Sequence, residues 1–298
     1  MKNRTKSGEK MKECVACQGV AGAFSHLAAT QVFPEREPRF YATFEAALEA
    51  VLNEEVLCAV LPVENSAAGR VSDRHRLLGE LPLFVTGEHF LRIRHCLLGT
   101  KSADLGSVRV VRSHPQALSQ CRLFLKGLGV ATEVSGNTAL AAEEVASLNR
   151  DDVAAIASES AAELYGLKIL KEGVEDSGLN TTRFWILSRE PAQNVAPDNA
   201  LTSFVFWVNN KPAALYKCLG GFATNGIDLL RLESYVDPER FLTSAGFLVD
   251  VAAHRESAAF QRAMEELMFF SGKVKLLGTY PAAPYRNELK KRQRGTTE

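Results

Sequence analysis

Short apolar runs alternate with amphipathic segments over the first 190 residues of the chain. The run from Val56 to Val63 is almost continuously apolar, as expected of a strand that is covered on both faces. Phe44 to Asn53 has helical periodicity and follows Thr43, a residue type that caps helices. The expected strands are 13–18, 39–42, 56–63, 83–86, 94–98, 108–111, 153–157 and 183–187, and the expected helices are 24–33, 44–53, one that begins at Pro115, 138–148 and 159–165. This alternation predicts a mostly parallel α/β sheet, in which ligands gather where strands end and helices begin.

A second module follows a polar segment with two prolines, Pro191 to Ala200, which we interpret as a linker. Beyond it the pattern predicts strands at 203–208, 229–235, 244–252 and 274–279, and helices at 213–224 and 258–270. The order βαββαβ is that of a ferredoxin-like module, and such units often pair through their sheets. Residues 1–12 and 283–298 are polar and rich in Lys and Arg, so we expect them to be flexible tails.

Charge and hydropathy exclude several classes of function. Lys+Arg and Asp+Glu both count 35, so the chain lacks the positive field that attracts a phosphate backbone, and we expect no nucleic acid partner. No apolar stretch approaches the ~18 to 20 residues that cross a bilayer, so we expect no membrane partner either. The chain starts without an apolar signal-peptide core, which predicts a cytoplasmic protein with reduced cysteines. Cys14 and Cys17 form a lone CxxC pair, which we interpret as strand residues rather than a metal site.

Small hydroxyl and amide residues follow several of the apolar strands. The segments are Gly22 to Ser25, Glu64 to Ser66, Ser113 to Gln116, Asn137-Thr138 and Asn180 to Arg183. Free N–H groups and the helix dipole make such helix starts suitable for anions, although any one of them alone is equally typical of a set of N-caps. Because five occur together and the last adds a guanidinium fork, the sequence favours a small carboxylate or phosphate ligand.

The chain resembles the prephenate and arogenate dehydratases in four separated motifs that follow the family's order. They are Gln18 to Ser25, Leu61 to Ser66, Ser113 to Leu118 and Thr182-Arg183-Phe184, and the similarity extends from residue 13 to about 282. The resemblance implies a two-lobed catalytic domain at 13–190, similar to periplasmic binding proteins, with the active site between the lobes. Lobe 1 would comprise about 13–90 and 179–190, lobe 2 about 91–178, and a regulatory ACT domain 200–282.

The implied reaction converts prephenate to phenylpyruvate in phenylalanine biosynthesis, with carbon dioxide and hydroxide lost as the ring becomes aromatic. The resemblance implies no cofactor and no metal for this step. Thr182 matches the family's catalytic threonine. Because an alcohol is a weak acid, we expect Thr182 to act as a hydrogen-bond donor or proton relay. Asn65 and Gln116 would orient the ring hydroxyl and the side chain of the substrate.

Prephenate carries two carboxylates, and the chain offers a set of residues that could hold them. We expect Arg183 to clamp one carboxylate through its bidentate fork. The other expected substrate-binding residues are Ser25, Ser66, Ser113 and Phe184. His114 is expected to cap the helix that begins at Pro115. Glu64 is expected to contact the substrate-binding residues and not the substrate itself.

The second module is similar to ACT domains that bind phenylalanine between subunits, which implies a phenylalanine effector and a homodimer or homotetramer. The expected effector-binding residues are Ala213, Ala214, Leu215, Glu233 and Ser234. Two departures from the family fall in these segments. Ala213 stands where the family has Gly and adds a methyl group, and Tyr235 replaces a cation. Control by phenylalanine is therefore an open hypothesis.

Two alternatives to a prephenate dehydratase stay open at this point. Arogenate differs from prephenate only by an amino group in place of the keto group, so the chain could use arogenate or both substrates. A two-lobed binding fold with an effector module could also be a non-catalytic amino-acid sensor, which the Thr182-Arg183-Phe184 signature disfavours.

Overall fold

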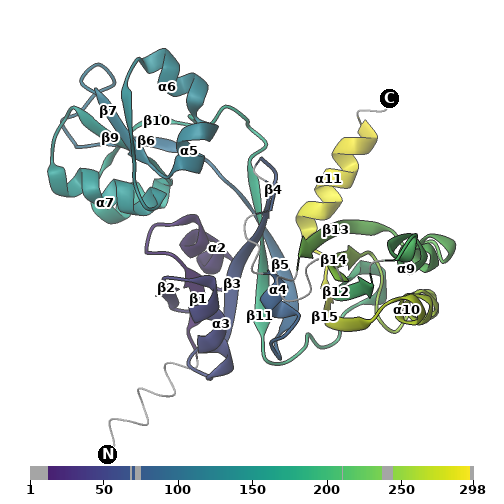
Figure 1. Cartoon of the computed structure of the whole chain (residues 1–298). Helices are drawn as coiled ribbons and strands as arrows, with labels where there is room; N and C mark the ends of the chain where they lie inside the picture. Colours follow the sequence, from purple (N-terminus) through teal and green to yellow (C-terminus); the bar gives the residue numbers. More distant parts are fainter. Residues whose placement is uncertain (1–12, 68, 71–74, 210, 237–243, 296–298) are drawn as a thin grey trace, which may run out of the picture. The chain divides into compact units, whose positions relative to one another are not determined.

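The computed structural model describes residues 13–67, 69–70, 75–209, 211–236 and 244–295 (Figure 1). The chain divides into two compact units, one with residues 1–71 and 89–184 and the other with residues 72–88 and 185–298. Two of the boundaries between these units fall inside strands. The boundary after residue 88 lies in β5 (Phe84–Arg92), and the boundary after residue 184 lies in β11 (Thr181–Ser188). The predicted tail at 1–12 lies outside the described residues.

The first sheet combines the amino-terminal strands β1 to β4 with β5 and β11 from later in the sequence. Its strands are β1 (Val15–Gln18), β2 (Pro38–Tyr41), β3 (Cys58–Asn65), β4 (Gly69–Arg70), β5 (Phe84–Arg92) and β11 (Thr181–Ser188), and its helices are α2 (Phe24–Val32) and α3 (Phe44–Leu52). The strand order is β2-β1-β3-β11-β5, with β4 paired to β3, and β1 runs parallel to β2 and β3. The hydroxyl of Thr43 accepts a hydrogen bond from the Ala46 amide at 3.1 Å, which confirms the predicted cap of α3.

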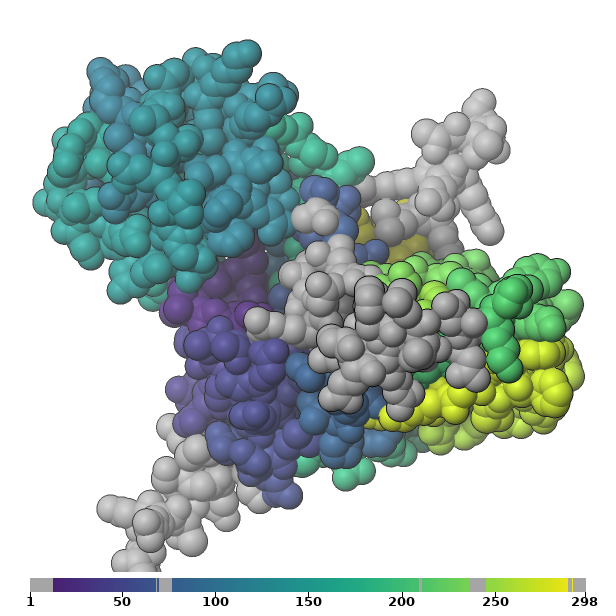
Figure 2. All heavy atoms as spheres, viewed as in Figure 1, coloured from purple at the N-terminus to yellow at the C-terminus, as the bar shows by residue number. Residues whose placement is uncertain are grey.

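The second sheet and its helices form one rounded body, drawn in teal in Figure 2. The strands are β6 (Cys96–Gly99), β7 (Val110–Ser113), β8 (Ala131–Val134), β9 (Val153–Ala157) and β10 (Lys168–Glu172), in the order β10-β6-β9-β7-β8. The helices are α5 (Pro115–Gln120), α6 (Arg122–Leu128), α7 (Thr138–Leu148) and α8 (Glu159–Tyr165). All five residues of β9 are buried, which explains its continuous apolar sequence.

This sheet is mixed, whereas the sequence pattern predicts a mostly parallel one. β7 runs parallel to β8 and β9, but β6 is antiparallel to both β9 and β10. A parallel neighbour requires a crossover connection, usually a helix. Helices α5, α6 and α7 provide such connections among the parallel strands β7, β8 and β9, whereas β6 enters the second sheet directly from β5, which ends at Arg92.

The second unit contains the predicted ferredoxin-like arrangement. In chain order its elements are α4 (His75–Leu78), the short helix η1 (Pro197–Asn199), β12 (Ala200–Asn209), α9 (Ala214–Thr224), β13 (Leu229–Val236), β14 (Ser244–Val251), α10 (Ala258–Phe270), β15 (Lys273–Pro281) and α11 (Pro284–Gly295). The sheet order is β13-β14-β12-β15, and each of these pairings is antiparallel. The βαββαβ order predicted from the sequence is therefore confirmed.

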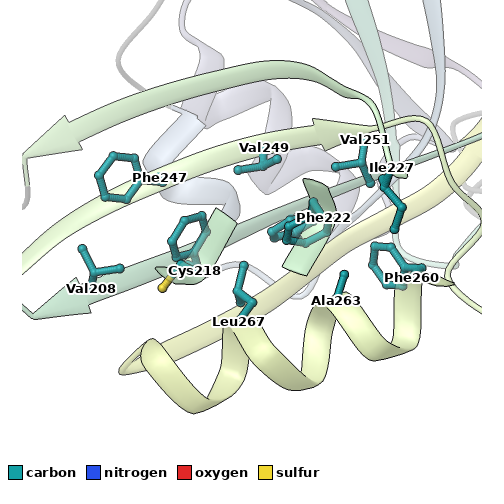
Figure 3. Packing of buried hydrophobic residues seen from close by; sticks show 12 residues of the cluster. Val208, Cys218, Phe222, Ile227, Phe247, Val249, Val251, Phe260, Ala263 and Leu267 are labelled. Atoms are coloured by element: carbon teal, nitrogen blue, oxygen red, sulfur yellow. The ribbon is translucent and has the colours of Figure 1, made fainter. Parts of the chain in front are cut away.

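One face of this sheet packs on α9 and α10 through aromatic side chains. Phe204 of β12 stacks on Phe222 of α9 with ring centroids 5.5 Å apart, and both side chains are fully buried. Figure 3 shows Phe260, Ala263 and Leu267 pointing from one side of α10 toward the sheet. Their spacing of three and four residues places them on one face of the helix, as the sequence pattern predicts.

Helix α11 corrects the expectation that residues 283–298 form a flexible tail, since residues 284–295 are helical. Arg286 donates to both carboxylate oxygens of Glu88, with Nε–Oε1 at 2.6 Å and Nη2–Oε2 at 2.9 Å. The Ala283 amide donates to the same carboxylate at 3.0 Å, and the Glu88 side chain is fully buried. The bidentate ion pair between Arg286 and the buried Glu88 fixes the start of α11. The composition of residues 283–298 alone does not indicate that Glu88 is their partner. Across the described ranges, every helix is too short or too polar to span a bilayer.

Candidate functional site

A pocket of about 310 Å³ in the first unit collects residues from both of its sheets. Its lining consists of Gln18, Gly19, Ala23, Phe24, Ser25, Pro62, Asn65, Ile93, His95, His114, Gln116, Ala117, Gln120, Asn137, Thr138, Thr182 and Phe184. Gln18 and Asn65 end strands β1 and β3, while Gln116 and Thr138 lie at the starts of α5 and α7. The pocket therefore lies where strands end and helices begin, as expected of α/β sheets.

The structure brings five of the predicted site residues together in this pocket. Thr182, Asn65 and Gln116, the predicted catalytic residues, all line it. Ser25 and Phe184, predicted to bind substrate, line it as well. These residues lie up to 159 positions apart in the chain, so the common location is a property of the fold and not of one segment.

Arg183 does not line the pocket, which corrects the expectation of a direct carboxylate clamp. Successive side chains of a strand point to opposite faces, so a strand that turns Thr182 and Phe184 toward the pocket turns Arg183 away. The guanidinium is buried, with a side-chain exposure of 2%, and Nη1 lies 3.5 Å from Oε2 of Glu64. Arg183 and Glu64 thus form an ion pair on the opposite side of β11 from the pocket.

Ser66 and Ser113 also lie outside the pocket lining, and their hydroxyls have structural partners. Ser66 Oγ donates to the Leu179 carbonyl at 2.7 Å and accepts from the Thr181 amide at 2.9 Å. Ser113 is fully buried and donates to the Ile156 carbonyl at 2.6 Å, which links β7 to β9. Their positions next to pocket residues made them candidates, but their side chains stabilise the strands instead.

The hydroxyl of Thr182 is oriented by buried amide groups. Nδ2 of Asn65 donates to Oγ1 of Thr182 at 2.9 Å and to Oδ1 of Asn180 at 2.8 Å. Oδ1 of Asn65 accepts from the Ala67 amide at 3.0 Å, so the Asn65 side chain is held at both ends. Since Thr182 Oγ1 accepts from Asn65, its own hydrogen can be donated to a ligand in the pocket.

A chain of hydrogen bonds extends from this threonine to a buried histidine that the sequence analysis missed. Asn180 Nδ2 donates to Gln120 Oε1 at 3.1 Å, and His95 Nε2 lies 3.0 Å from the same oxygen. His95 is 2% exposed, lines the pocket and meets Phe24 edge to face at 5.4 Å. Burial lowers the pKa of His95, against smaller opposing effects of Gln120 and Glu175. A polar residue directly before the apolar strand β6 was the available signal.

The predicted caps at the pocket are present. His114 Nδ1 accepts from the Gln116 amide at 3.3 Å, so His114 caps α5 as expected. Asn137 Oδ1 accepts from the Leu140 amide at 2.8 Å and caps α7. Among the lining residues, no side chain is a Lys, Arg, Asp or Glu, so the pocket offers neutral donors and two imidazoles.

The glycine turn before α2 contacts the second sheet's helix α8. Gly22 has φ +79, a conformation that favours glycine, and a Cβ there would lie 3.2 Å from Cα of Ala161. The Gly22 carbonyl accepts a hydrogen bond from Ser158 Oγ at 2.6 Å. This close approach explains why the turn carries glycine next to the pocket residues Ala23 to Ser25.

The predicted effector residues lie on α9 and β13 of the second unit. Ala213 caps α9 with φ +62, a left-handed conformation that disfavours a side chain. Ala214 and Leu215 are partly buried against the core of this unit. Glu233 Oε1 accepts from Arg231 Nη2 at 2.8 Å, and Ser234 lies beside it on β13.

Tyr235, the other departure from the family, covers a glycine on the neighbouring strand. It pairs with Gly246 across β13 and β14, and a Cβ on Gly246 would lie within 2.3 Å of the Tyr235 ring. The ring also meets Trp207 edge to face at 6.1 Å. Tyr235 therefore has a packing role in this sheet.

Fold and pocket define a two-lobed α/β protein with an uncharged polar pocket, joined to a ferredoxin-like module. A sequence model of the family described as prephenate dehydratase matches residues 15–192. The bifunctional N-acyl-homoserine lactone acylase/prephenate dehydratase of Komagataeibacter europaeus is 44% identical over 95% of this chain and 99% of that protein. Arogenate dehydratase/prephenate dehydratase 2 of Arabidopsis thaliana is 39% identical over 90% of this chain and 72% of that protein.

A solved structure extends the similarity to the whole fold. The prephenate dehydratase of Arthrobacter aurescens in complex with L-Phe has a TM-score of 0.83 at 25% identity, over 90% of this chain and 89% of that one. The chain belongs to the prephenate dehydratase family, a family of lyases. The fold class predicted from the sequence is confirmed.

Proposed function

We propose that this protein is a prephenate dehydratase that forms phenylpyruvate for phenylalanine biosynthesis. The observation that carries the proposal is the hydroxyl of Thr182. It lines the pocket, accepts from Asn65 at 2.9 Å and keeps its hydrogen for a ligand. A departing hydroxide needs such a donor, and a donor placed where negative charge develops contributes about 10²- to 10³-fold in rate.

The main contribution of the protein to this reaction is to orient the substrate and the Thr182 hydroxyl. The bond between the ring and its carboxylate breaks, and the electron pair moves through the diene as carbon dioxide leaves. In the same step this electron pair expels the ring hydroxyl, and the hydroxide departs with a proton from water or from the Thr182 hydroxyl, which solvent restores. Asn65 orients Thr182, and Gln116, which lines the pocket at the start of α5, would orient the side chain of the substrate. The gain of aromaticity drives the step.

Arogenate dehydratase activity, alone or with prephenate, is the nearest alternative. The relative from Arabidopsis thaliana bears both activities in its name. Arogenate has the same ring and leaving group, so the role of Thr182 would be unchanged. The test is a spectrophotometric assay of the purified chain with each pure substrate. Phenylpyruvate from prephenate supports the proposal, and product from arogenate alone replaces it with the arogenate reaction.

Hydrolysis of acyl-homoserine lactones is a second candidate, favoured by the name of the 44% identical relative. A covalent route needs a nucleophile within about 2.6–3.2 Å of a base. The pocket has hydroxyls on Ser25, Thr138 and Thr182, but none of them hydrogen-bonds a histidine among the described side chains. The geometry therefore supports this activity less. The same preparation, incubated with an acyl-homoserine lactone and analysed for free acid, tests it.

The proposal includes regulation of the enzyme by phenylalanine through the second unit, which we assign as an ACT domain. The support is the βαββαβ order and the L-Phe complex of the Arthrobacter aurescens relative. We place the effector at Ala213 to Leu215 and at Glu233 and Ser234, in a homodimer or homotetramer located in the cytoplasm. An activity that stays constant up to millimolar phenylalanine would remove the regulation and leave the catalytic proposal intact. An inactive chain that binds phenylalanine tightly would instead indicate a sensor.

A further inference from the structure

The pocket described above poses an electrostatic problem for the proposed substrate, which is a dianion. Its lining contains no Lys or Arg, and the guanidinium of Arg183 lies on the far side of β11. Neutral donors can hold a carboxylate, but burial of two negative charges without a counter-charge is costly. The only lining side chains that can become positive are His95 and His114.

The contacts of His95 fix which nitrogen of its neutral ring carries the proton. Nε2 lies 3.0 Å from Gln120 Oε1, an oxygen that also accepts from Asn180 Nδ2. Because an amide oxygen only accepts, Nε2 must be the protonated nitrogen of the neutral ring. Nδ1 then has a lone pair, and it is buried without a hydrogen-bond partner among the described residues. A second proton can therefore be added only at Nδ1.

His114 differs from His95 because its Nδ1 already accepts a hydrogen bond. Its Nδ1 accepts the Gln116 amide at the cap of α5, so this nitrogen must stay unprotonated to keep the cap. A proton on His114 Nδ1 would end that hydrogen bond. His95 has no such competing contact at Nδ1 and is the better proton acceptor on geometric grounds.

We propose that His95 takes up one proton at Nδ1 when the dianionic substrate binds, and so becomes the positive charge of the pocket. This inference rests on the proposed function. The step forms one N–H bond with a proton from solvent, breaks no bond in the protein and keeps the Nε2 hydrogen bond to Gln120. The protonated ring then supplies a positive charge beside the bound dianion, which makes His95 a residue that selects for anionic ligands.

The surroundings of His95 decide the sign of the pH dependence. Burial lowers its pKa, while the hydrogen bond to Gln120 and the charge of Glu175, whose Oε2 accepts from the His95 amide at 2.9 Å, raise it less. Phe24 on α2 is apolar, and the acidic residue Asp176 donates through its amide to the Gln120 carbonyl at 2.7 Å. The free enzyme thus has neutral His95 at pH 7. A bound dianion raises the pKa of His95, so binding strengthens as the pH falls.

The test is the pH profile of kcat/KM for prephenate between pH 6 and pH 8.5, with the rate of a blank without enzyme subtracted. An interaction with one charged group supplies a factor of about 10 to 150, and a buried imidazolium at the pocket wall should supply one at the lower end of this range. We expect kcat/KM of the wild type to fall by about tenfold over this range, while kcat changes less because the bound substrate keeps the proton on His95. His95→Gln keeps a donor for Gln120 but cannot titrate, and we expect its kcat/KM to vary less than about twofold.

His89→Gln is the matched control. His89 is also a histidine whose pKa is lowered by burial, and its Nε2 lies 2.9 Å from Gln31 Oε1, but it does not line the pocket. This variant is expected to keep the wild-type pH profile. A flat profile in an active wild type would overturn the proposal, and so would a His95→Gln or His95→Asn variant with the wild-type slope, or loss of the slope only in His114→Gln. A wild type without any turnover would instead refute the proposed function itself.

Discussion

Replacement of Asn65 by Asp tests the orientation of Thr182 with almost no change in shape. Asn65 Nδ2 donates to Thr182 Oγ1 at 2.9 Å and to Asn180 Oδ1 at 2.8 Å, and the side chain is 5% exposed. An aspartate cannot make either donation, but its second oxygen can still accept the Ala67 amide. The Thr182 hydroxyl would then turn its hydrogen toward Asp, and the leaving hydroxide would lose its donor.

The expected cost follows from these contacts. Loss of one well-placed donor lowers kcat by about 10²- to 10³-fold. The hydrogen bond to Thr182 is remade in the reverse direction, but the bond to Asn180 is lost and its buried oxygen is left without this donor, which lowers the free energy of unfolding by roughly 1–3 kcal/mol. The repulsion between a buried carboxylate and a dianion adds to the loss in kcat/KM.

The assay is phenylpyruvate formation at pH 8, where the new carboxyl group is ionised, with urea denaturation of the same preparations. Thr182→Val and the double variant Asn65→Asp/Thr182→Val complete a double-mutant cycle. Because the hydroxyl is already redirected in Asn65→Asp, the second change should lower kcat by less than about threefold further. Additive losses in the cycle, or an Asn65→Asp enzyme within threefold of wild type, would refute this reasoning.

Three stability predictions concern positions outside the pocket lining. Ala213→Gly relieves a left-handed alanine at φ +62 and should raise the free energy of unfolding by about 0.5–1 kcal/mol in urea titrations, whereas an unchanged or lower value would contradict the strain. Arg286→Ala removes the bidentate ion pair with the buried Glu88 carboxylate and should lower the free energy of unfolding by about 2–4 kcal/mol. Lys291→Ala, at an exposed position of the same helix, should leave it unchanged. Gly22→Ala, at φ +79 and against α8, should cost about 1–3 kcal/mol and lower kcat/KM, and a wild-type melting temperature would show that the turn tolerates a side chain.

The sequence predicts elements best where burial on one or both faces leaves a pattern. The fully buried strand β9 and the capped helix α3 appear where expected. Strand β8 was not predicted, and all four of its residues are exposed at the sheet edge. Strand β10, at the other edge of the same sheet, has two adjacent apolar residues flanked by Lys and Glu, and none of its residues is buried. Edge strands carry little of the hydrophobic signal on which such predictions depend.

The sequence motifs predict which residues share the site better than they predict which way each side chain points. The motifs correctly placed Thr182, Asn65 and Gln116 in one pocket. Polarity does not distinguish the two faces of β11, because residues 181–185 are all buried, so only strand alternation from Thr182 and Phe184 indicates that Arg183 points away from the pocket. His95 joins the site through side-chain contacts that only the folded chain brings together.

The central claim is that the Thr182 hydroxyl assists the departure of hydroxide from prephenate, and kcat of Thr182 variants tests it most directly. Thr182→Ser keeps the hydroxyl, and Thr181→Ala removes a neighbouring hydroxyl that does not line the pocket. We predict that Thr182→Ala lowers kcat for phenylpyruvate formation by about 10²-fold or more, while Thr182→Ser and Thr181→Ala stay within about tenfold of wild type. A folded Thr182→Ala enzyme with a kcat within threefold of wild type would contradict the account.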